Sequence, residues 1–114
     1  MAVRHLELQH RWGCHPVWDR DHDVELDPIV LDLPASVVER LASWASRWDL
    51  TFDIEHPERP KVEHFVLEEL GRDGARLWRA LLGLLDPQEW EIAYVHDDVI
   101  YRTVQDLPLE WRLG

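Results

Sequence analysis

The stretch "EWEIAYVHDDVIYRTV", residues 89–104, decides the fold that we expect. Its first half alternates strictly, so that one face of a strand carries Trp90, Ile92, Tyr94 and His96. Alternation with a period of two residues is typical of a half-buried strand. Val99 and Tyr101 resume the alternation after Asp97-Asp98, a pair that lacks the glycine preferred in a tight turn. The pattern therefore predicts a β-hairpin with its turn at these aspartates.

Two amphipathic stretches precede the hairpin and predict helices. Within residues 34–48, the positions that share one face at helical spacing are Val37, Val38, Leu41, Trp44, Ala45 and Trp48. Ser36 and Glu39 have the spacing of a capping box, which predicts the start of this helix. A second helical region runs from about Val62 to Leu85. Two glycines weaken its middle, each by about 1 kcal/mol against alanine, so we expect either two helices or one helix with a bend.

The first third of the chain predicts short strands and a loop. Residues 3–12 alternate as a strand does, and residues 13–23 are predicted as a loop because they combine glycine, proline and clustered aspartates. Residues 24–34 alternate around Pro28, which cannot donate to a ladder, so we expect an edge strand or two short pieces. The tryptophans predicted to pack in the core are Trp44, Trp48, Trp78 and Trp90, with Trp111 as an anchor for the tail.

The order of these elements predicts the architecture: strand, possible strand, helix, helix, strand, strand. We expect an α+β fold in which two helices pack on one face of a mainly antiparallel sheet. A chain of 114 residues suits one domain, and no linker or repeat divides it, so residues 1–114 are predicted to form a single α+β domain.

Composition and charge narrow the class of protein. Twelve Lys and Arg residues against 23 Asp and Glu residues leave a formal net charge of −11 at pH 7. We expect no nucleic-acid binding, which needs basic patches against phosphates, and no binding to anionic membranes. The longest apolar segment, residues 75–85, is interrupted by Arg79 and is too short to span a bilayer. A single cysteine, and an N-terminus without the apolar core of a signal peptide, indicate a cytoplasmic protein.

The segment "HRWGCHPVWDRDHD", residues 10–23, raises the question of a metal site. It holds the one cysteine of the chain and three of its seven histidines. The candidate ligands are His10, Cys14, His15 and His22, with neighbouring aspartates. The spacing of these residues matches no zinc signature, and a calcium-binding loop would need a glycine and a glutamate at positions where this chain has valines. The neighbouring aspartates raise the pKa of a thiol, which opposes an activated Cys14 thiolate. We expect no cofactor, and a small metal-dependent enzyme using this segment stays an alternative.

The same segment favours recognition of another protein. A tryptophan beside carboxylates is typical of an interface hot spot, because the ring supplies contact area and the acids complement arginine or lysine. Tyr101 and His96 form a second, smaller candidate patch with the hairpin turn. The residues predicted to bind a basic partner protein are Trp18, Asp19, Asp21, Asp23, Asp97 and Asp98. An acidic surface that serves only solubility, and a scaffold subunit of a larger assembly, are the other interpretations.

Three phrases carry a resemblance to known proteins: "LASWASRWDLTFD", "DGARLWRALLGLL" and "WEIAYVHDDVIYR". Over roughly residues 31–102 the chain resembles small acidic bacterial proteins of unassigned function, and this general build is similar to that of toxin-immunity proteins. The resemblance implies the fold alone, and it implies neither chemistry nor a site residue. The acidic, tryptophan-flanked surface makes a non-catalytic protein that binds another protein the leading hypothesis, and its concrete form is an inhibitor or immunity protein that occupies a basic groove of its partner.

Overall fold

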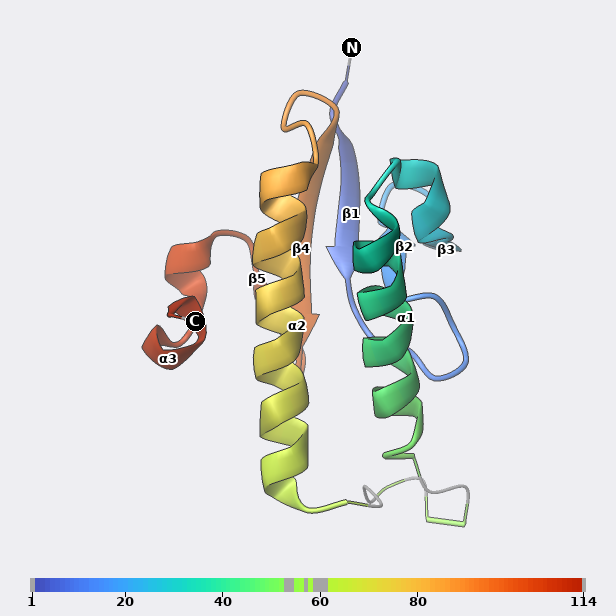
Figure 1. The fold of residues 1–114 in the computed structure, drawn as a ribbon, viewed down its shortest axis with the longest axis vertical. Coiled ribbons are helices and arrows are strands. Elements are labelled where there is room, and N and C mark those ends of the chain that lie inside the picture. The colour runs from blue at the N-terminus through green and yellow to red at the C-terminus, as the bar shows by residue number, and fades with distance from the viewer. Residues whose placement is uncertain (1, 53–54, 57, 59–61, 114) are drawn as a thin grey trace.

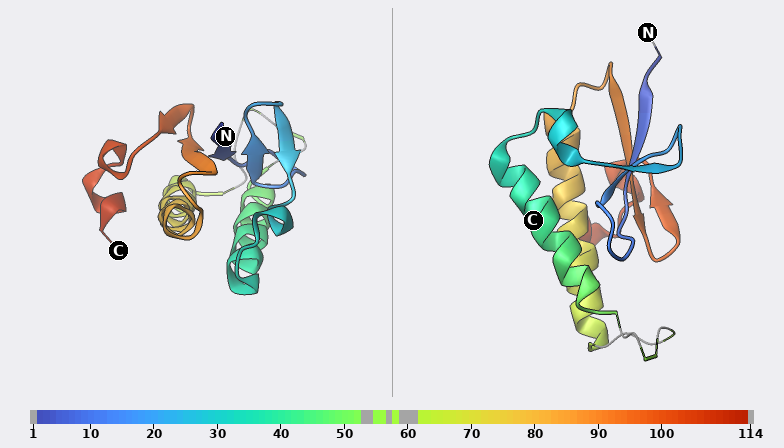
Figure 2. Two further views of the ribbon diagram at one scale, coloured as in Figure 1. Left: turned by 90° about the horizontal axis from the view of Figure 1, so that it is seen from above. Right: turned by 90° about the vertical axis from the view of Figure 1, so that its right-hand side faces the viewer.

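Five strands form one sheet, and two long helices lie against one of its faces (Figures 1 and 2). The structure is a computed structural model that describes residues 2–52, 55–56, 58 and 62–113. The strands are β1 (Arg4–Leu8), β2 (Val17–Asp19), β3 (Val24–Leu26), β4 (Trp90–His96) and β5 (Val99–Tyr101). The helices are α1 (Ala35–Asp49), α2 (His64–Leu84) and α3 (Leu109–Arg112), with 3-10 turns at Pro28–Leu31 and Val104–Asp106. Within the described ranges, no helix is both long and apolar enough to cross a bilayer.

The sheet has the order β3-β2-β1-β4-β5. Its outer pairs are antiparallel, whereas the central strands β1 and β4 run parallel, with Leu6 opposite Ile92 and Leu8 opposite Tyr94. The predicted α+β class and mainly antiparallel sheet are confirmed. The parallel central pair was not predicted, and it has a structural consequence. The carboxyl ends of β1 and β4 meet at the same edge of the sheet, so the residues that follow them are neighbours.

The first third of the chain differs from the prediction in one strand. Residues 13–23 were expected to be a loop, but β2 occupies Val17–Asp19 and all three of its residues are buried. Pro16 stands just before β2, where its missing N–H disturbs no ladder bond. The expectation for residues 24–34 is confirmed, because β3 is an edge strand and a separate 3-10 turn begins at Pro28.

The capping box predicted for the first helix is wrong. Helix α1 begins at Ala35, so its N-cap is Pro34 and no side chain caps it. Ser36 is therefore already inside the first turn, two positions after the N-cap from which a side chain accepts from the free backbone donors. Instead, the carbonyl of Pro34 accepts from the backbone N–H of Val37 at 2.9 Å.

Helix α2 is continuous for 21 residues, because its two central glycines face aromatic rings instead of breaking it. A Cβ on Gly74 would overlap the Tyr94 hydroxyl and lie 2.6 Å from Cζ2 of Trp44. A Cβ on Gly71 would lie 2.7 Å from Nε2 of His96. The glycines thus let the helix approach the sheet closely. Tyr94 Oη uses this approach to donate a 2.7 Å hydrogen bond to the Gly71 carbonyl.

The core lies between the sheet and helices α1 and α2. Trp44 and Trp78 are buried there, and Trp48, Trp90 and Trp111 pack against it, as predicted. The indole N–H of Trp44 donates to the Leu70 carbonyl at 2.8 Å, and that of Trp78 donates to the Ile92 carbonyl at 2.9 Å. These bonds satisfy the polar atoms of two large rings and fix their orientation in the core.

The predicted hairpin is confirmed as β4 and β5, which pair antiparallel. Asp97 and Asp98 adopt left-handed backbone angles, with φ of 52° and 62°. A two-residue turn needs positive φ at both positions when it matches the twist of the strands, and aspartate tolerates this conformation better than most residues. The two acids are therefore displayed side by side at the end of the sheet.

Candidate functional site

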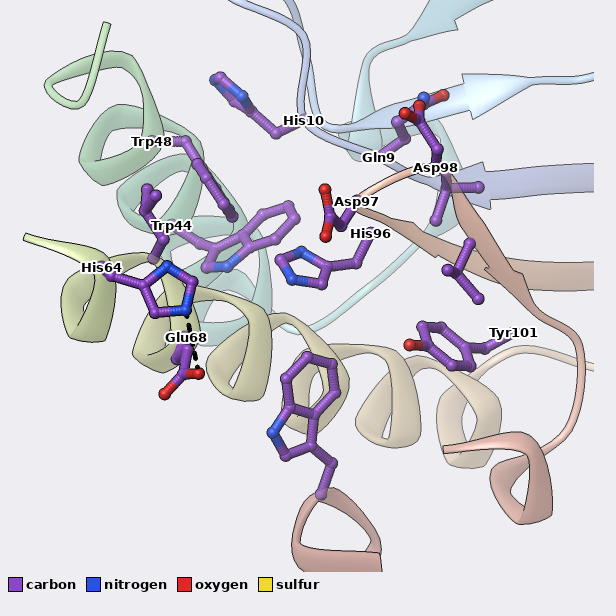
Figure 3. A pocket seen from close by; sticks show the side chains of 14 residues that line it. Gln9, His10, Trp44, Trp48, His64, Glu68, His96, Asp97, Asp98 and Tyr101 are labelled. Carbon is purple, nitrogen blue, oxygen red and sulfur yellow. Dashed lines mark ion pairs between the residues drawn. The ribbon is translucent and has the colours of Figure 1, made fainter. Parts of the chain in front are cut away.

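A groove of about 730 Å³ opens beyond the carboxyl ends of β1 and β4 (Figure 3). The segment after β1 supplies Gln9 and His10, and the β4–β5 hairpin supplies Asp97 and Asp98. The remaining lining residues come from three helices and the hairpin: Trp44, Trp48, His64, Leu67, Glu68, Val95, His96, Val99, Tyr101 and Trp111. The parallel pairing of β1 with β4 thus builds a site from segments that are far apart in the chain.

Aromatic rings form the walls of the groove. His96 lies between two tryptophans, with ring centroids 5.9 Å from Trp48 and 5.3 Å from Trp111. Tyr101 lies 6.4 Å from Trp111, and His10 stacks on Trp48 at 5.5 Å. Rings that hold one another in this way lose little conformational freedom when a ligand binds against them.

The charged groups of the groove are acidic. Glu68 pairs with His64 at 3.2 Å, whereas Asp97 and Asp98 form no ion pair with any arginine or lysine in the described part of the chain. Among the described lining residues there is no arginine and no lysine. Figure 3 shows Asp97 pointing toward the middle of the groove, above His96. The groove therefore presents uncompensated carboxylates beside aromatic faces.

Burial keeps the ring of His96 neutral. Removal from water lowers its pKa, against a weaker opposing effect of Asp97, so the imidazole carries no charge at pH 7. Burial likewise raises the pKa of Tyr101, which stays protonated. Near neutral pH these two side chains thus add no charge to the wall, and the acids at the rim dominate the local potential. Such a site favours a cation over an anion.

The structure separates the six predicted partner-binding residues into two groups. Asp97 and Asp98 belong to the groove, while the other four lie on β2 and in the β2–β3 turn, nearer to the opposite end of the sheet. Asp19 is level with Ile92, because both pair with Leu6. At ~3.3 Å per strand residue, the turn at Asp97 lies about 16 Å further along the sheet. The six residues therefore form no single continuous patch.

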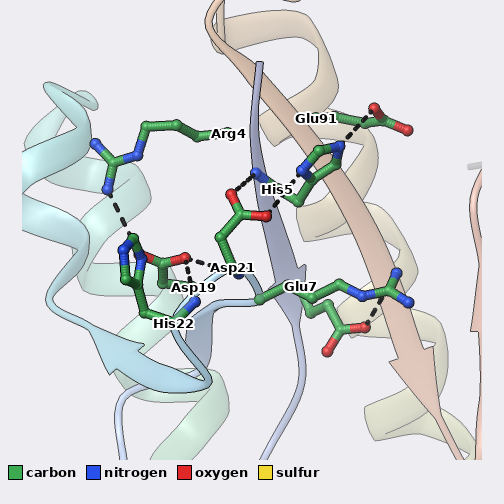
Figure 4. Close-up of polar contacts among 8 residues, drawn as sticks. Arg4, His5, Glu7, Asp19, Asp21, His22 and Glu91 are labelled. Carbon is green, nitrogen blue, oxygen red and sulfur yellow. Dashed lines mark hydrogen bonds and ion pairs between the residues drawn. The ribbon is translucent and has the colours of Figure 1, made fainter. Parts of the chain in front are cut away.

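Trp18 and Asp19 are buried in the folded chain. Trp18 lies on the sheet face opposite the helices, where the Arg11 guanidinium covers its ring at 4.1 Å and leaves 9% of the residue exposed. Asp19 is 4% exposed, and it contacts Arg4 at 3.6 Å and His22 at 2.8 Å (Figure 4). Both residues thus stabilise this end of the sheet. Their role in binding a partner stays a prediction.

Asp21 and Asp23 are exposed in the turn between β2 and β3. The backbone N–H and the ring of His5 both bond to Asp21, at 3.0 Å each, and hold its pKa below the usual value (Figure 4). Asp23 has a left-handed φ of 53°, as Asp97 and Asp98 have. In this group, Asp23 is the carboxylate with the least involvement in the fold.

The segment of residues 10–23 does not gather into a metal site. His10 Nε2 bonds to Asp49 at 2.7 Å, and His22 is engaged with Asp19. In the part of the chain that the structure describes, no three histidine, cysteine, aspartate or glutamate side chains come together as ligands. A hydrogen bond with Glu25 raises the pKa of the Cys14 thiol, which opposes a nucleophilic role.

One family model matches this chain. The family is described as "Serratia CdiI immunity protein-like", and the match covers residues 4–97. The chain belongs to this family. A comparison with curated proteins found no match. Membership in the Serratia CdiI immunity protein-like family implies that the chain binds a partner protein, a toxin, and the basic character expected of that partner stays a prediction.

The matched segment ends within the β4–β5 turn. Tyr101 and Trp111, which complete one wall of the groove, follow it in the chain. Sequence reasoning found the groove only in part: it singled out His96, Tyr101 and the two aspartates as a small patch. It missed Trp48, Trp111 and Glu68, because nothing local in the sequence indicates which helix faces meet beyond the end of the sheet.

Proposed function

We propose that this protein is a cytoplasmic immunity protein that binds a toxin and covers a basic surface which the toxin needs for its activity. The observation that carries the proposal is the family match over residues 4–97 in a chain of net charge −11. A toxin that acts on a polyanionic substrate presents basic residues to it, and an acidic protein on that surface excludes the substrate by occupation and by charge.

The charge favours fast association. A negative protein and a basic surface attract each other before contact, which raises the association rate above that of neutral partners. The attraction is screened over about 8 Å at physiological ionic strength, so the association rate falls as salt rises. An inhibitor that must reach a toxin before the toxin reaches its substrate gains directly from such steering.

Growth protection tests the proposal. Toxin domains encoded in the same genome are expressed one at a time in a sensitive host, with and without this protein. We expect one domain to arrest growth alone, to be neutralised on co-expression, and to co-purify in a one-to-one complex. Its association rate should fall at least tenfold between 50 and 500 mM NaCl. If no toxin domain is neutralised, the immunity function is refuted. If the association rate is independent of salt, the basic surface is refuted.

A further inference from the structure

We propose that the groove beyond β1 and β4 receives an arginine side chain of the toxin, with the guanidinium against the aromatic walls and beside the carboxylates of Asp97 and Asp98. The proposal rests on the immunity function, and it names the part of the surface that recognises the partner. Its evidence is the chemistry of the groove, the way in which this chain treats its own arginines, and the place of the groove in the fold.

The lining of the groove selects a cation. Indole and phenol faces carry negative partial charge and attract a cation within about 6 Å of the ring centre. Asp97 and Asp98 add full negative charges that no arginine or lysine among the described lining residues balances, and Glu68 adds a third carboxylate beside its partner His64. A phosphate or a carboxylate would be repelled from this site. An apolar side chain would cover the acids and remove them from water without a partner.

Guanidinium fits better than ammonium, because the guanidinium plane stacks on a ring while its edge donates to a carboxylate. The chain itself places a guanidinium over a tryptophan ring twice, and in one of the two cases a carboxylate lies beside it. The Arg4 guanidinium lies 4.5 Å from the centre of the Trp90 ring, and that of Arg11 lies 4.1 Å from the centre of the Trp18 ring. Arg4 also reaches the Asp19 carboxylate at 3.6 Å. The groove has the same kinds of ring and acid, but none of its described lining residues is an arginine.

The groove is also placed where an interface anchor is expected. Its walls come from separate helices and the hairpin, which hold the rings in position before a partner arrives. Val99, an apolar residue of its lining, is 47% exposed. Exposed apolar side chains around a pocket exclude water from the anchor when two proteins meet. A charged pair inside such a ring is strengthened by the lower local dielectric.

A peptide experiment tests the groove without the toxin. The probe is acetyl-Gly-Arg-Gly-amide, and the control is the same peptide with citrulline, which keeps the shape and loses the charge. We expect the arginine peptide, at millimolar concentration, to shift the indole N–H signals of Trp48 and Trp111 in NMR spectra. The signal of Trp12 should not move, and the citrulline peptide should have no effect. Absence of a shift with the arginine peptide refutes the proposal.

A matched pair of variants then tests use of the groove by the toxin. Asp97→Asn with Asp98→Asn removes the rim charges and keeps side chains that tolerate positive φ. Asp23→Asn with Asp21→Asn removes the same charge at the other end of the sheet. We expect the first pair to weaken toxin binding at least tenfold at 150 mM NaCl, and the second pair to weaken it less than threefold.

The outcomes separate the two proposals. If the wild-type protein neutralises the toxin but the groove variant binds it as tightly as wild type does, the groove proposal is refuted and the immunity function stands. If no toxin is neutralised while the arginine peptide binds in the groove, the immunity function is refuted, and with it the identity of the arginine donor. Circular dichroism of each variant confirms that a loss of binding is not a loss of fold.

Discussion

Replacing Gly74 by alanine should destabilise the protein, although the same change usually stabilises a helix. Glycine inside a helix costs about 1 kcal/mol against alanine, so an exposed site would gain that amount. At Gly74 the added methyl group would overlap the Tyr94 hydroxyl and lie 2.6 Å from Cζ2 of Trp44. Neither ring can move freely. Tyr94 Oη is bonded to the Gly71 carbonyl at 2.7 Å, and Trp44 Nε1 to the Leu70 carbonyl at 2.8 Å.

The expected change in the free energy of unfolding of Gly74→Ala is the cost of overpacking and of a lost hydrogen bond, less the gain in helix propensity. Overpacking a core costs typically 1–3 kcal/mol, and loss of one hydrogen bond adds about 1 kcal/mol. After the helix gain is subtracted, the free energy of unfolding should fall by about 2 kcal/mol, which lowers Tm by about 8 °C in a domain of this size.

Gly83 supplies the control within the same helix, because a Cβ there meets no atom within 4 Å. Gly83→Ala should raise the free energy of unfolding by about 0.5–1 kcal/mol. Urea unfolding followed by tryptophan fluorescence measures both variants. If Gly74→Ala stabilised the protein as much as Gly83→Ala does, the close packing of α2 on Tyr94 would be refuted.

Three further predictions concern the residues around the groove. Burial lowers the pKa of His96 below 6.5, so the unfolded chain takes up the proton first, and the stability that is complete above pH 6.5 is lost as the pH falls through the lower pKa of the folded state. His96→Phe should therefore flatten the dependence of the unfolding free energy on pH between 7.5 and 5, and an unchanged slope would contradict this prediction. Tyr94→Phe removes the hydrogen bond to Gly71 and should lower the free energy of unfolding by about 1 kcal/mol, which urea titration measures. Asp98→Gly should raise Tm by about 2–4 °C, because glycine adopts its φ of 62° without strain; a lower Tm would argue against the left-handed turn.

Local patterns predicted most elements of the fold, because period two and period 3.6 are properties of neighbouring residues. The hairpin around Asp97 and the helix that carries Trp44 and Trp48 follow from such patterns. Strand β2 does not, since three residues are too few to show a period and the surrounding turn residues dominate the composition. The glycines of α2 were interpreted as weak points, whereas their role depends on Tyr94, which lies on the sheet.

The candidate site was harder to predict, for the same reason. Which side chains lie beside Asp97 depends on the parallel pairing of β1 with β4, which has no local signal. Asp19 is paired with Arg4, which comes from β1, and with His22 of the β2–β3 turn. Sequence could show that acids and tryptophans are abundant. Only the fold shows that some acids are already paired within the chain and that others face an open groove.

The central position of β1 has a consequence for the synthesis of the chain. β1 is synthesised well before β4, yet Arg4 of β1 pairs across the parallel ladder with Trp90 of β4. Until β4 has emerged, one edge of β1 lacks its neighbour, and contacts of such long range form slowly. The central parallel ladder therefore forms only after β4 has been synthesised. Until then, the unpaired edge of β1 is open to misassembly, which chaperones counteract.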